Sequence, residues 1–294
     1  MRVLLTGADG QVGWELQRQT PLGVTLDACG RQALDITDFS AVQRYFSQSL
    51  PEVVINCAAY TAVDRAESES ERAFAINRDG AANLAQAVKE INAHFIHLST
   101  DFIFNGRQST PYTPDSTADP LSVYGQSKWQ GEARVRDILG DNALILRTAW
   151  VYSSHGQNFV KTMLRLMRER SQLGVVVDQI GTPTWAATIA TLIWRLLQQH
   201  KVLQGTLHVT DLGVASWYDF AVAIYQEGQR LGLLQREVVI NPITTQDYPT
   251  AALRPAYSVL EKGDSWRLAA WQPPHWRDAL IQMLSELAVP SVAS

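Results

Sequence analysis

Short apolar runs alternate with longer segments of helical period through the first half of the chain. The runs, at residues 2–6, 24–28, 52–56, 94–99 and 143–148, are rich in β-branched residues, and several are apolar at nearly every position, as expected of strands buried on both faces. The helical segments lie at 11–20, 38–50, 69–93 and 122–139. This alternation predicts an α/β protein with a doubly wound parallel sheet of the Rossmann type.

After Trp150 the alternation is less regular. Helical segments at 157–171, 186–199, 216–231 and 275–288 are separated by proline-bearing loops. We therefore expect a Rossmann domain over residues 1–149, rejoined by part of 185–212, and a smaller mixed α/β domain over 150–294. A cleft between the two would hold a ligand.

The composition favours small-molecule chemistry. The chain has 294 residues, 46% of them apolar and 18% charged, with a net charge of −4 and no run of Lys or Arg, so nothing indicates a nucleic acid or an anionic membrane as partner. The N-terminus lacks a signal-peptide core and no apolar run is long enough to span a membrane, which predicts a cytoplasmic protein. Cys29 and Cys57 show no CxxC spacing, so we expect two buried thiols without a disulfide or zinc site.

A glycine turn follows the first predicted strand. In LLTGADGQVG, Gly7, Gly10 and Gly13 lie between that strand and the first helix, where a dinucleotide-binding protein needs a tight turn and close approach of the backbone to a pyrophosphate. The GxxGxxG spacing is typical of short-chain dehydrogenases and reductases, and a purely structural turn is the alternative. Near the end of the second strand, Asp27 is followed by Arg31, which could face a 2′-phosphate. We therefore expect NADPH or NADH with a slight preference for NADPH, unless Arg31 is only a solvated charge.

Tyr124 and Lys128 in VYGQSKWQGE are four residues apart and share one face of a predicted helix. An ammonium within about 4–6 Å favours the phenolate, so the pair could form a general acid with a lowered pKa. The alternative is a tyrosine that packs on a lysine stem. Ser99, Thr100 and Asp101 end the preceding strand, at the sheet edge where α/β proteins bind ligands.

Several motifs together resemble one family over residues 7–260. They include NCAAYTAVDRAE, STDFIFNG, PLSVYGQSKWQGE, LRTAWVY, DQIGTPT and LRPAYSVL, and they are similar to those of the dTDP-4-dehydrorhamnose reductase family, which is part of the extended short-chain reductase superfamily. The resemblance implies NAD(P)H-dependent reduction of the C4 ketone of dTDP-4-dehydro-β-L-rhamnose to dTDP-β-L-rhamnose.

The resemblance also assigns site residues. Tyr124 would donate the proton, Lys128 would bind the ribose and tune the phenol, and Thr100 would assist. Cofactor contacts would come from the glycine turn and from two later loops, through Gly7, Gly10, Gln11, Val12, Gly13, Arg31, Asp35, Ile36, Ala59, Tyr60 and Thr61. Substrate contacts would come from Thr100, Asp101 and Trp150, with Asn158 and Arg254 as further candidates.

Some of these residues have structural alternatives. Asp35 could belong to a helix-start network in which Asp38 is the better N-cap, and Trp150 could be part of the core. Asp64 could shape the substrate loop or mark a charged helix start. We interpret His97 and His208 as core histidines rather than metal ligands.

The resemblance leaves the assembly and two other functions open. Some family members pair through a magnesium ion held by glutamates; here Ala187 replaces one of them, although Glu15 and Glu286 remain, so we predict a monomer or weak dimer with no magnesium link and no other metal site. The alternatives are a nucleotide-sugar epimerase or dehydratase, which Phe102 in TDFIF disfavours, and a non-catalytic regulatory subunit that binds NADP. Residues 101–120 are a candidate lid.

Overall fold

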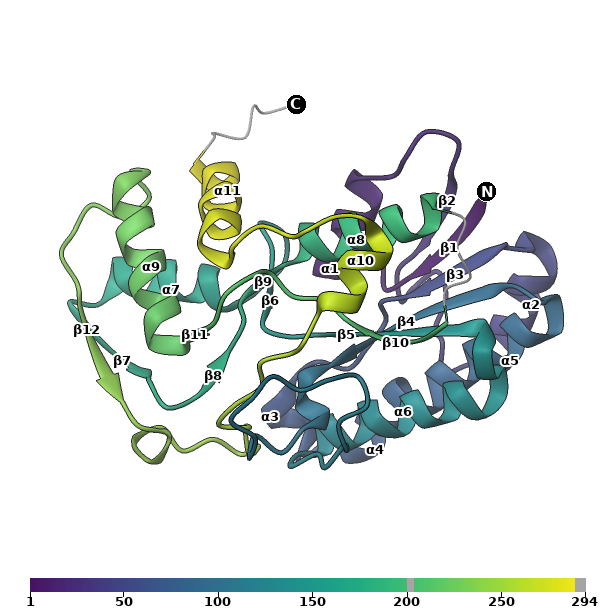
Figure 1. The fold of residues 1–294 in the computed structure, drawn as a ribbon, viewed down its shortest axis with the longest axis horizontal. Helices are drawn as coiled ribbons and strands as arrows, with labels where there is room; N and C mark the ends of the chain where they lie inside the picture. Colours follow the sequence, from purple (N-terminus) through teal and green to yellow (C-terminus); the bar gives the residue numbers. More distant parts are fainter. Residues whose placement is uncertain (200–203, 289–294) are drawn as a thin grey trace.

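A computed structural model describes residues 1–199 and 204–288 (Figure 1). Its centre is a six-stranded sheet whose neighbouring strands all run parallel. In spatial order the strands are β10 (Gly205–His208), β5 (Ala143–Thr148), β4 (His94–Thr100), β3 (Val53–Asn56), β1 (Arg2–Thr6) and β2 (Thr25–Cys29). The predicted α/β class with a parallel sheet is confirmed. β10 is not among the runs that the sequence predicts as strands.

Helices cover both faces of this sheet (Figure 1). One face carries α2 (Phe39–Ser49), α5 (Ala81–Ile91) and α6 (Val123–Leu139). The other carries α1 (Gln11–Arg18), α8 (Ala186–Gln198) and α10 (Gly263–Ala269). Alternate strand residues enter the two layers: Leu144 and Leu146 pack under α8, whereas Ala143 and Ile145 pack under α5 and α6. Burial on both faces explains why these strands are apolar at nearly every position.

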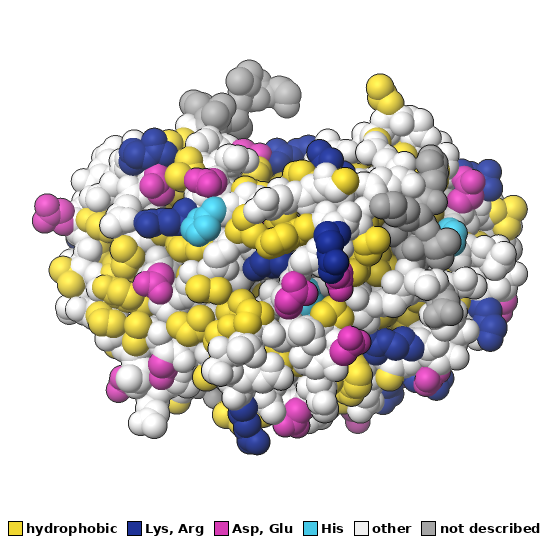
Figure 2. Space-filling model, in the orientation of Figure 1, with side chains coloured by type: hydrophobic (Ala, Val, Ile, Leu, Met, Phe, Trp, Pro, Cys, Tyr) yellow, Lys and Arg dark blue, Asp and Glu magenta, His cyan; other side chains and the backbone are white. Residues whose placement is uncertain are grey.

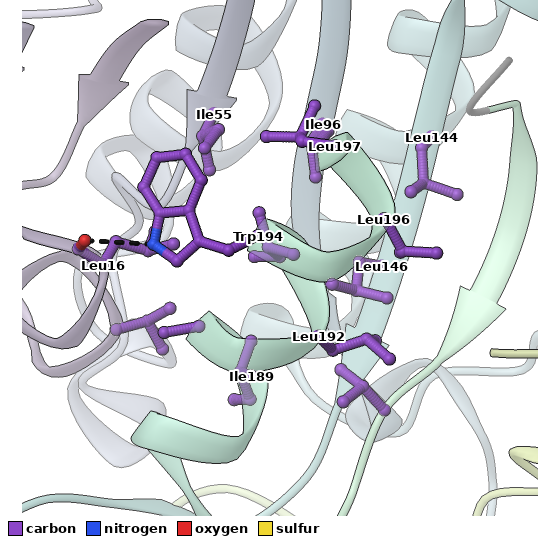
Figure 3. Packing of buried hydrophobic residues seen from close by; sticks show 14 of the residues in the cluster. Leu16, Ile55, Ile96, Leu144, Leu146, Ile189, Leu192, Trp194, Leu196 and Leu197 are labelled. Atoms are coloured by element: carbon purple, nitrogen blue, oxygen red, sulfur yellow. Dashed lines mark hydrogen bonds between the residues drawn. The ribbon is translucent and has the colours of Figure 1, made fainter. Parts of the chain in front are cut away.

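Helix α8 packs on the sheet although it lies in the second half of the chain, after the five strands of the first half. Its Trp194 is 3% exposed and packs among Leu16, Ile55 and Ile96, and its indole Nε1 donates a hydrogen bond to the Leu16 carbonyl at 3.1 Å (Figure 3). A buried indole needs such an acceptor. This contact holds α8 against α1 and so fixes the start of the second half of the chain beside the glycine turn.

The remaining elements form a second group with its own core. Helices α7 (Phe159–Glu169), α9 (Trp217–Arg230) and α11 (Trp276–Ala288) pack around Phe220, with β7 (Gln172–Val176) and β12 (Val239–Ile243) paired in parallel at one side. Short pairs link this group to the loops that follow the sheet. They are β6 (Val151–Tyr152) with β9 (Thr184–Trp185), and β8 (Ile180–Gly181) with β11 (Ala215–Ser216).

The helix that the sequence predicts over 69–93 is interrupted. After the short helix α3 (Val63–Ala66), the chain forms α4 (Ser70–Phe74), a π-helical turn over Ala75–Gly80, and only then α5. The turn contains Asn77, whose side chain bonds outside the helix (below). A π-turn of this kind often occurs at a functional site. The prediction of one continuous helix assumes a constant period of 3.6 residues over 69–93 and so does not allow for the extra residue of such a turn.

Three 3₁₀ turns complete the described elements, at Asp101–Ile103, Gly140–Asn142 and Thr245–Asp247. Within residues 1–199 and 204–288 there is no helix with the length and apolar character that a membrane crossing requires. Acidic and basic side chains are interspersed on the face shown in Figure 2.

Candidate active site

The glycine turn brings two stretches of backbone into contact. Gly7 has a φ of +73°, and a Cβ placed on it would lie 2.5 Å from the backbone of Cys57 and Ala58, after β3. A Cβ on Gly13 would lie 2.3 Å from the Gly7 carbonyl oxygen. At the start of α1, Gly10 provides no side-chain cap. The first amides of α1 are therefore left to a ligand, and a helix N-terminus of this kind favours an anion.

A first cavity, of about 330 Å³, extends from this turn towards the end of β2. Arg31 and Asp35 line it, 3.6 Å apart, and Asp35 also accepts hydrogen bonds from the backbone and hydroxyl of Thr37. These bonds hold the pKa of Asp35 below its usual value. Asp38, not Asp35, caps α2, as the sequence predicts. Asp27 accepts from the Tyr45 hydroxyl at 2.6 Å and is not among the residues that line the cavity.

The sequence interpretation missed two residues around this cavity. Arg72 also lines it, so the cavity has a second guanidinium besides that of Arg31. Asn77, in the π-turn, bonds both backbone groups of Tyr60 and donates to the Ser127 hydroxyl of α6. It thereby fixes the loop after β3 to the helix that carries Tyr124. No local signal in the sequence singles out Asn77, because the same helical segment also carries Arg78 and Asp79.

A second cavity, of about 390 Å³, continues the first beyond the glycine turn. Both cavities are lined by Gly10, Ala59 and Thr61, so they form one trough across the carboxyl ends of the strands. Lys128 and Tyr124 lie along its far part. Cys57 also lines the trough; the residue is partly exposed but packs against the core under α8, and burial raises the pKa of its thiol to about 12. The prediction of a buried thiol is therefore confirmed only in part.

Tyr124 and Lys128 share one face of α6, which begins at the N-cap Ser122. The prediction that the ammonium lowers the pKa of the phenol is wrong for this structure. Burial raises the pKa of Tyr124 to about 12, and the Thr100 hydroxyl only partly opposes the shift. The Lys128 ammonium donates to the Leu98 carbonyl at 2.6 Å, and burial lowers its pKa to about 8. Loss of water is the largest cause of the shift in both pKa values.

A third cavity, of about 340 Å³, lies where β4 and β5 end side by side. Thr100 and Thr148 are partners in the sheet register, and both line the cavity with Tyr124 and Asp101. The Thr100 hydroxyl donates to Asp101 Oδ1 at 3.1 Å. Asp101 Oδ2 and Thr148 Oγ1 are buried and have no hydrogen-bond partner among the described residues. Buried polar atoms of this kind need partners, which a polar ligand in the cavity would provide.

Trp150 forms one wall of the third cavity in a backbone conformation that is rare for a large residue. Its φ is +49°, and its indole lies so close to Gly181 that a Cβ there would be 2.5 Å from the ring. The opposite ring face stacks on Trp217, with centroids 3.5 Å apart and an interplanar angle of 4°. The sequence analysis assigns a role to Trp150 but none to Trp217, which lies 67 positions away in the motif SWYDFA.

Asn158 joins the second group of elements to the glycine turn. It caps α7 by accepting from the Lys161 amide, and it donates to Gln11 Oε1 at 2.9 Å and to the Ser153 carbonyl at 2.7 Å. Ser153 in turn donates to Glu15, which is fully buried in α1. The loop over 153–158 is therefore held against the trough from both sides.

Glu15 and Glu286 are bridged by a cation from the chain itself. Arg18 lies between them and contacts an oxygen of each at 2.8 Å. Ala187, at the position where the sequence comparison expects a third carboxylate, is buried. Among residues 1–199 and 204–288 no group of three or more His, Cys, Asp or Glu side chains could hold a metal ion.

Arg254 has an acidic partner that the sequence does not indicate. It forms an ion pair with Asp64 in α3, with contacts of 2.7 and 3.0 Å, and these hydrogen bonds hold the pKa of Asp64 below its usual value. Arg254 also lines a fourth cavity, of about 460 Å³, between α7, β7 and Trp217. Asp64 therefore anchors the loop of the second group instead of only starting a helix.

The candidate lid over 101–120 is tied down at its middle. Tyr112 is 1% exposed and exchanges backbone hydrogen bonds with Val259 and Glu261, and the buried Arg147 donates to the Pro114 carbonyl at 2.9 Å.

The interpretation of His97 and His208 as core histidines holds in part. His208 bonds the Glu261 carbonyl, whereas Nε2 of the buried His97 has no partner among the described residues.

Fold and site together define the class of the protein, an oxidoreductase of the short-chain dehydrogenase/reductase type with a trough shaped for a dinucleotide. Comparisons with known proteins narrow the class. The family model described as RmlD substrate binding domain matches residues 1–289. The spore coat polysaccharide biosynthesis protein SpsK of Bacillus subtilis is 41% identical over 286 residues, which cover 97% of each chain.

Two solved structures are similar over nearly the whole chain. A dTDP-4-dehydrorhamnose reductase of Clostridium acetobutylicum has a TM-score of 0.91 and 38% identity, and covers 98% of this chain and 99% of its own. The dTDP-4-dehydrorhamnose reductase of Bacillus anthracis, in complex with NADP, has a TM-score of 0.89 and 37% identity, and covers 97% of this chain and 99% of its own. The chain therefore belongs to the dTDP-4-dehydrorhamnose reductase family, as its motifs predict.

Proposed function

We propose that the protein reduces the C4 ketone of dTDP-4-dehydro-β-L-rhamnose with NADPH or NADH and releases dTDP-β-L-rhamnose. The observation that carries the proposal is the meeting of Tyr124, Thr100 and Asp101 at one cavity, directly beside the trough of the glycine turn. The names of the two similar structures, one of them holding NADP, support it.

The trough fits a dinucleotide. Gly7 and Gly13 allow the turn to pack closely on the backbone of Cys57 and Ala58 and on itself, which brings the start of α1 to the trough. The uncapped amides of α1 would hold a pyrophosphate there with Gln11 and Val12. Arg31, Asp35 and Ile36 would enclose the adenosine. Ala59, Tyr60 and Thr61 would run along the cofactor towards Lys128. When bound, the reduced nicotinamide supplies the hydride.

Tyr124 is the proposed proton donor. A neutral phenol is the form that can give a proton to a developing alkoxide, and the raised pKa of about 12 keeps Tyr124 neutral before reaction. Lys128 would contact the ribose while it keeps its bond to the Leu98 carbonyl, because an ammonium has three donors. Thr100 would donate to the same substrate oxygen after its hydroxyl turns away from Asp101 Oδ1, and Asp101 Oδ2 would accept from a sugar hydroxyl.

The second group of elements would bind the rest of the substrate. We assign residues 1–149, with part of 185–212, to cofactor binding, and 150–294 mainly to substrate binding. Trp150 would lie against the sugar, and Asn158 would keep Gln11 in place. The fourth cavity, lined by Met163, Val175 and Arg254 among others, has the size and apolar walls for a nucleoside with a cation at its edge. The monomeric or weakly dimeric state and the cytoplasmic location stay predictions.

The test supplies the purified protein with the ketosugar and either NADPH or NADH. We expect stoichiometric loss of absorbance at 340 nm and formation of the rhamnosyl product. Tyr124→Phe should lower kcat by about 10²–10⁴-fold, the usual contribution of a general acid. Tyr218→Phe, which removes a hydroxyl in α9, is the control. Turnover by Tyr124→Phe close to that of wild type would refute the role of Tyr124.

A further inference from the structure

Two stacked indoles separate the third and fourth cavities. Trp150 lines the third cavity with Tyr124, and Trp217 lines the fourth. Their ring planes are nearly parallel, with an interplanar angle of 4°, and their centroids are 3.5 Å apart. Trp150 cannot retreat, because its other face lies on the Gly181 backbone. Trp150 is thus held between Gly181 and Trp217. A displacement of Trp217 removes one of these two supports and so changes the wall of the cavity that Tyr124 lines.

Gln179 connects this stack to a turn on the far side of the fourth cavity. It is 6% exposed, and its Oε1 accepts from Trp217 Nε1 at 3.2 Å while its Nε2 donates to Thr245 Oγ1 at 3.1 Å. An indole N–H can only donate, so Oε1 must face Trp217. The Thr245 hydroxyl donates its proton to Asp178 Oδ1 at 2.7 Å, so its oxygen is free to accept from Gln179. The amide of Gln179 therefore has one orientation that satisfies both sides.

The turn that Thr245 begins is hydrogen-bonded at its start and is followed by an exposed residue. Asp178 also accepts from the Thr245 amide, and Thr244 and Asp247 form a reciprocal capping box. Tyr248 follows immediately, lines the fourth cavity and is 58% exposed. A ligand that fills the fourth cavity meets Tyr248, and any shift of the turn is transmitted to Gln179 through a single hydrogen bond.

We propose that Gln179 is a positioning residue that couples occupation of the fourth cavity to the placement of Trp150 beside Tyr124. This rests on the proposed function, in which the nucleotide binds the fourth cavity and the sugar binds the third. Binding energy from a non-reacting part of a substrate raises the rate when it orders the reacting part. The chain Tyr248, Thr245, Gln179, Trp217, Trp150 is a physical route for that effect. Gln179 itself lines only the fourth cavity and does not touch the reacting atoms.

The experiment compares Gln179→Leu and Thr245→Val, which each remove the hydrogen bond between Gln179 and the turn, with the exposed control Gln235→Leu. Kinetic measurements use saturating NADPH, and thymidine diphosphate alone is titrated by calorimetry. For Thr245→Val, whose side chain does not line the fourth cavity, we expect kcat to fall about tenfold while the dissociation constant of thymidine diphosphate changes less than threefold. The double variant should be no worse than Gln179→Leu, because both changes break one chain. A change in KM with kcat unaltered, or a loss of nucleotide binding equal to the loss of kcat, would overturn the proposal.

A second readout does not depend on turnover. Stacked indoles give a coupled circular dichroism signal, which Trp217→Phe should abolish and thymidine diphosphate should alter in the wild type. In Thr245→Val and Gln179→Leu the nucleotide should bind without altering it. An unchanged response in Thr245→Val refutes the coupling even if Gln179→Leu does not fold. A wild type that shows the response but never oxidises NADPH or NADH would refute the proposed function and leave the coupling intact.

Discussion

Replacing Asp101 by Asn should make the protein more stable and less active. Asp101 is 1% exposed at the end of β4, and one of its carboxylate oxygens has no hydrogen-bond partner among the described residues. Burial raises the pKa of this carboxyl from its ordinary 3.8 to about 6. The ionised form is thus disfavoured in the folded protein, which is the opposite of a carboxylate that stabilises a fold.

The size of the effect follows from linkage between protonation and folding. A difference of about two pH units between the unfolded and folded pKa corresponds to about 3 kcal/mol. Between pH 3.8 and about 6 the folded protein binds more protons than the unfolded chain, so the free energy of unfolding falls as pH rises through this window. At pH 7 the full penalty is present. Asn has the same shape and no charge, and its oxygen can still accept from Thr100, so Asp101→Asn should gain about 1–3 kcal/mol.

Urea unfolding followed by circular dichroism at pH 7.5 and pH 4.5 measures this gain. The advantage of Asp101→Asn should be clear at pH 7.5 and should shrink as pH falls below about 6, since the wild-type carboxyl is then protonated in the folded state. Asp137→Asn, at an exposed position of α6, is the control and should show neither effect. The kcat/KM of Asp101→Asn should fall, because the amide oxygen accepts from Thr100 and the nitrogen that replaces Oδ2 cannot accept from the sugar hydroxyl. A variant that is less stable than wild type at pH 7.5, or equally stable at both pH values, would refute the reasoning.

Two further substitutions test the trough. Gly7→Ala should destabilise the protein by more than about 2 kcal/mol, from the left-handed φ and the backbone 2.5 Å away, whereas Gly232→Ala, with the same φ of +73° and open space around it, should lose only about 1 kcal/mol; thermal unfolding compares them, and equal losses would contradict the assigned contact. Arg31→Ala should raise the KM for NADPH several-fold and leave that for NADH unchanged, with the exposed Arg44→Ala as control. An equal effect on both cofactors would remove Arg31 from 2′-phosphate recognition.

Local patterns predicted the parts of the molecule that neighbouring residues decide. The apolar runs predicted five of the six strands of the sheet within about a residue. Four of these are largely buried and have little freedom to be polar, whereas β2 is a partly exposed edge strand. The glycine spacing located the turn between β1 and α1, because only glycine has the φ and the size required at Gly7. The i, i+4 spacing put Tyr124 and Lys128 on one face of α6.

The amino-acid sequence by itself therefore determined the alternation of strands and helices in the first half of the chain, the glycine turn and many of the side chains that line the trough. The tertiary structure alone decided the direction of the Tyr124 pKa, the partner of Arg254 and the stacking of Trp150 on Trp217. Each of these depends on groups distant along the chain: desolvation is set by everything that surrounds a side chain, and an ion pair or a ring contact across the fold leaves no periodic trace in the sequence.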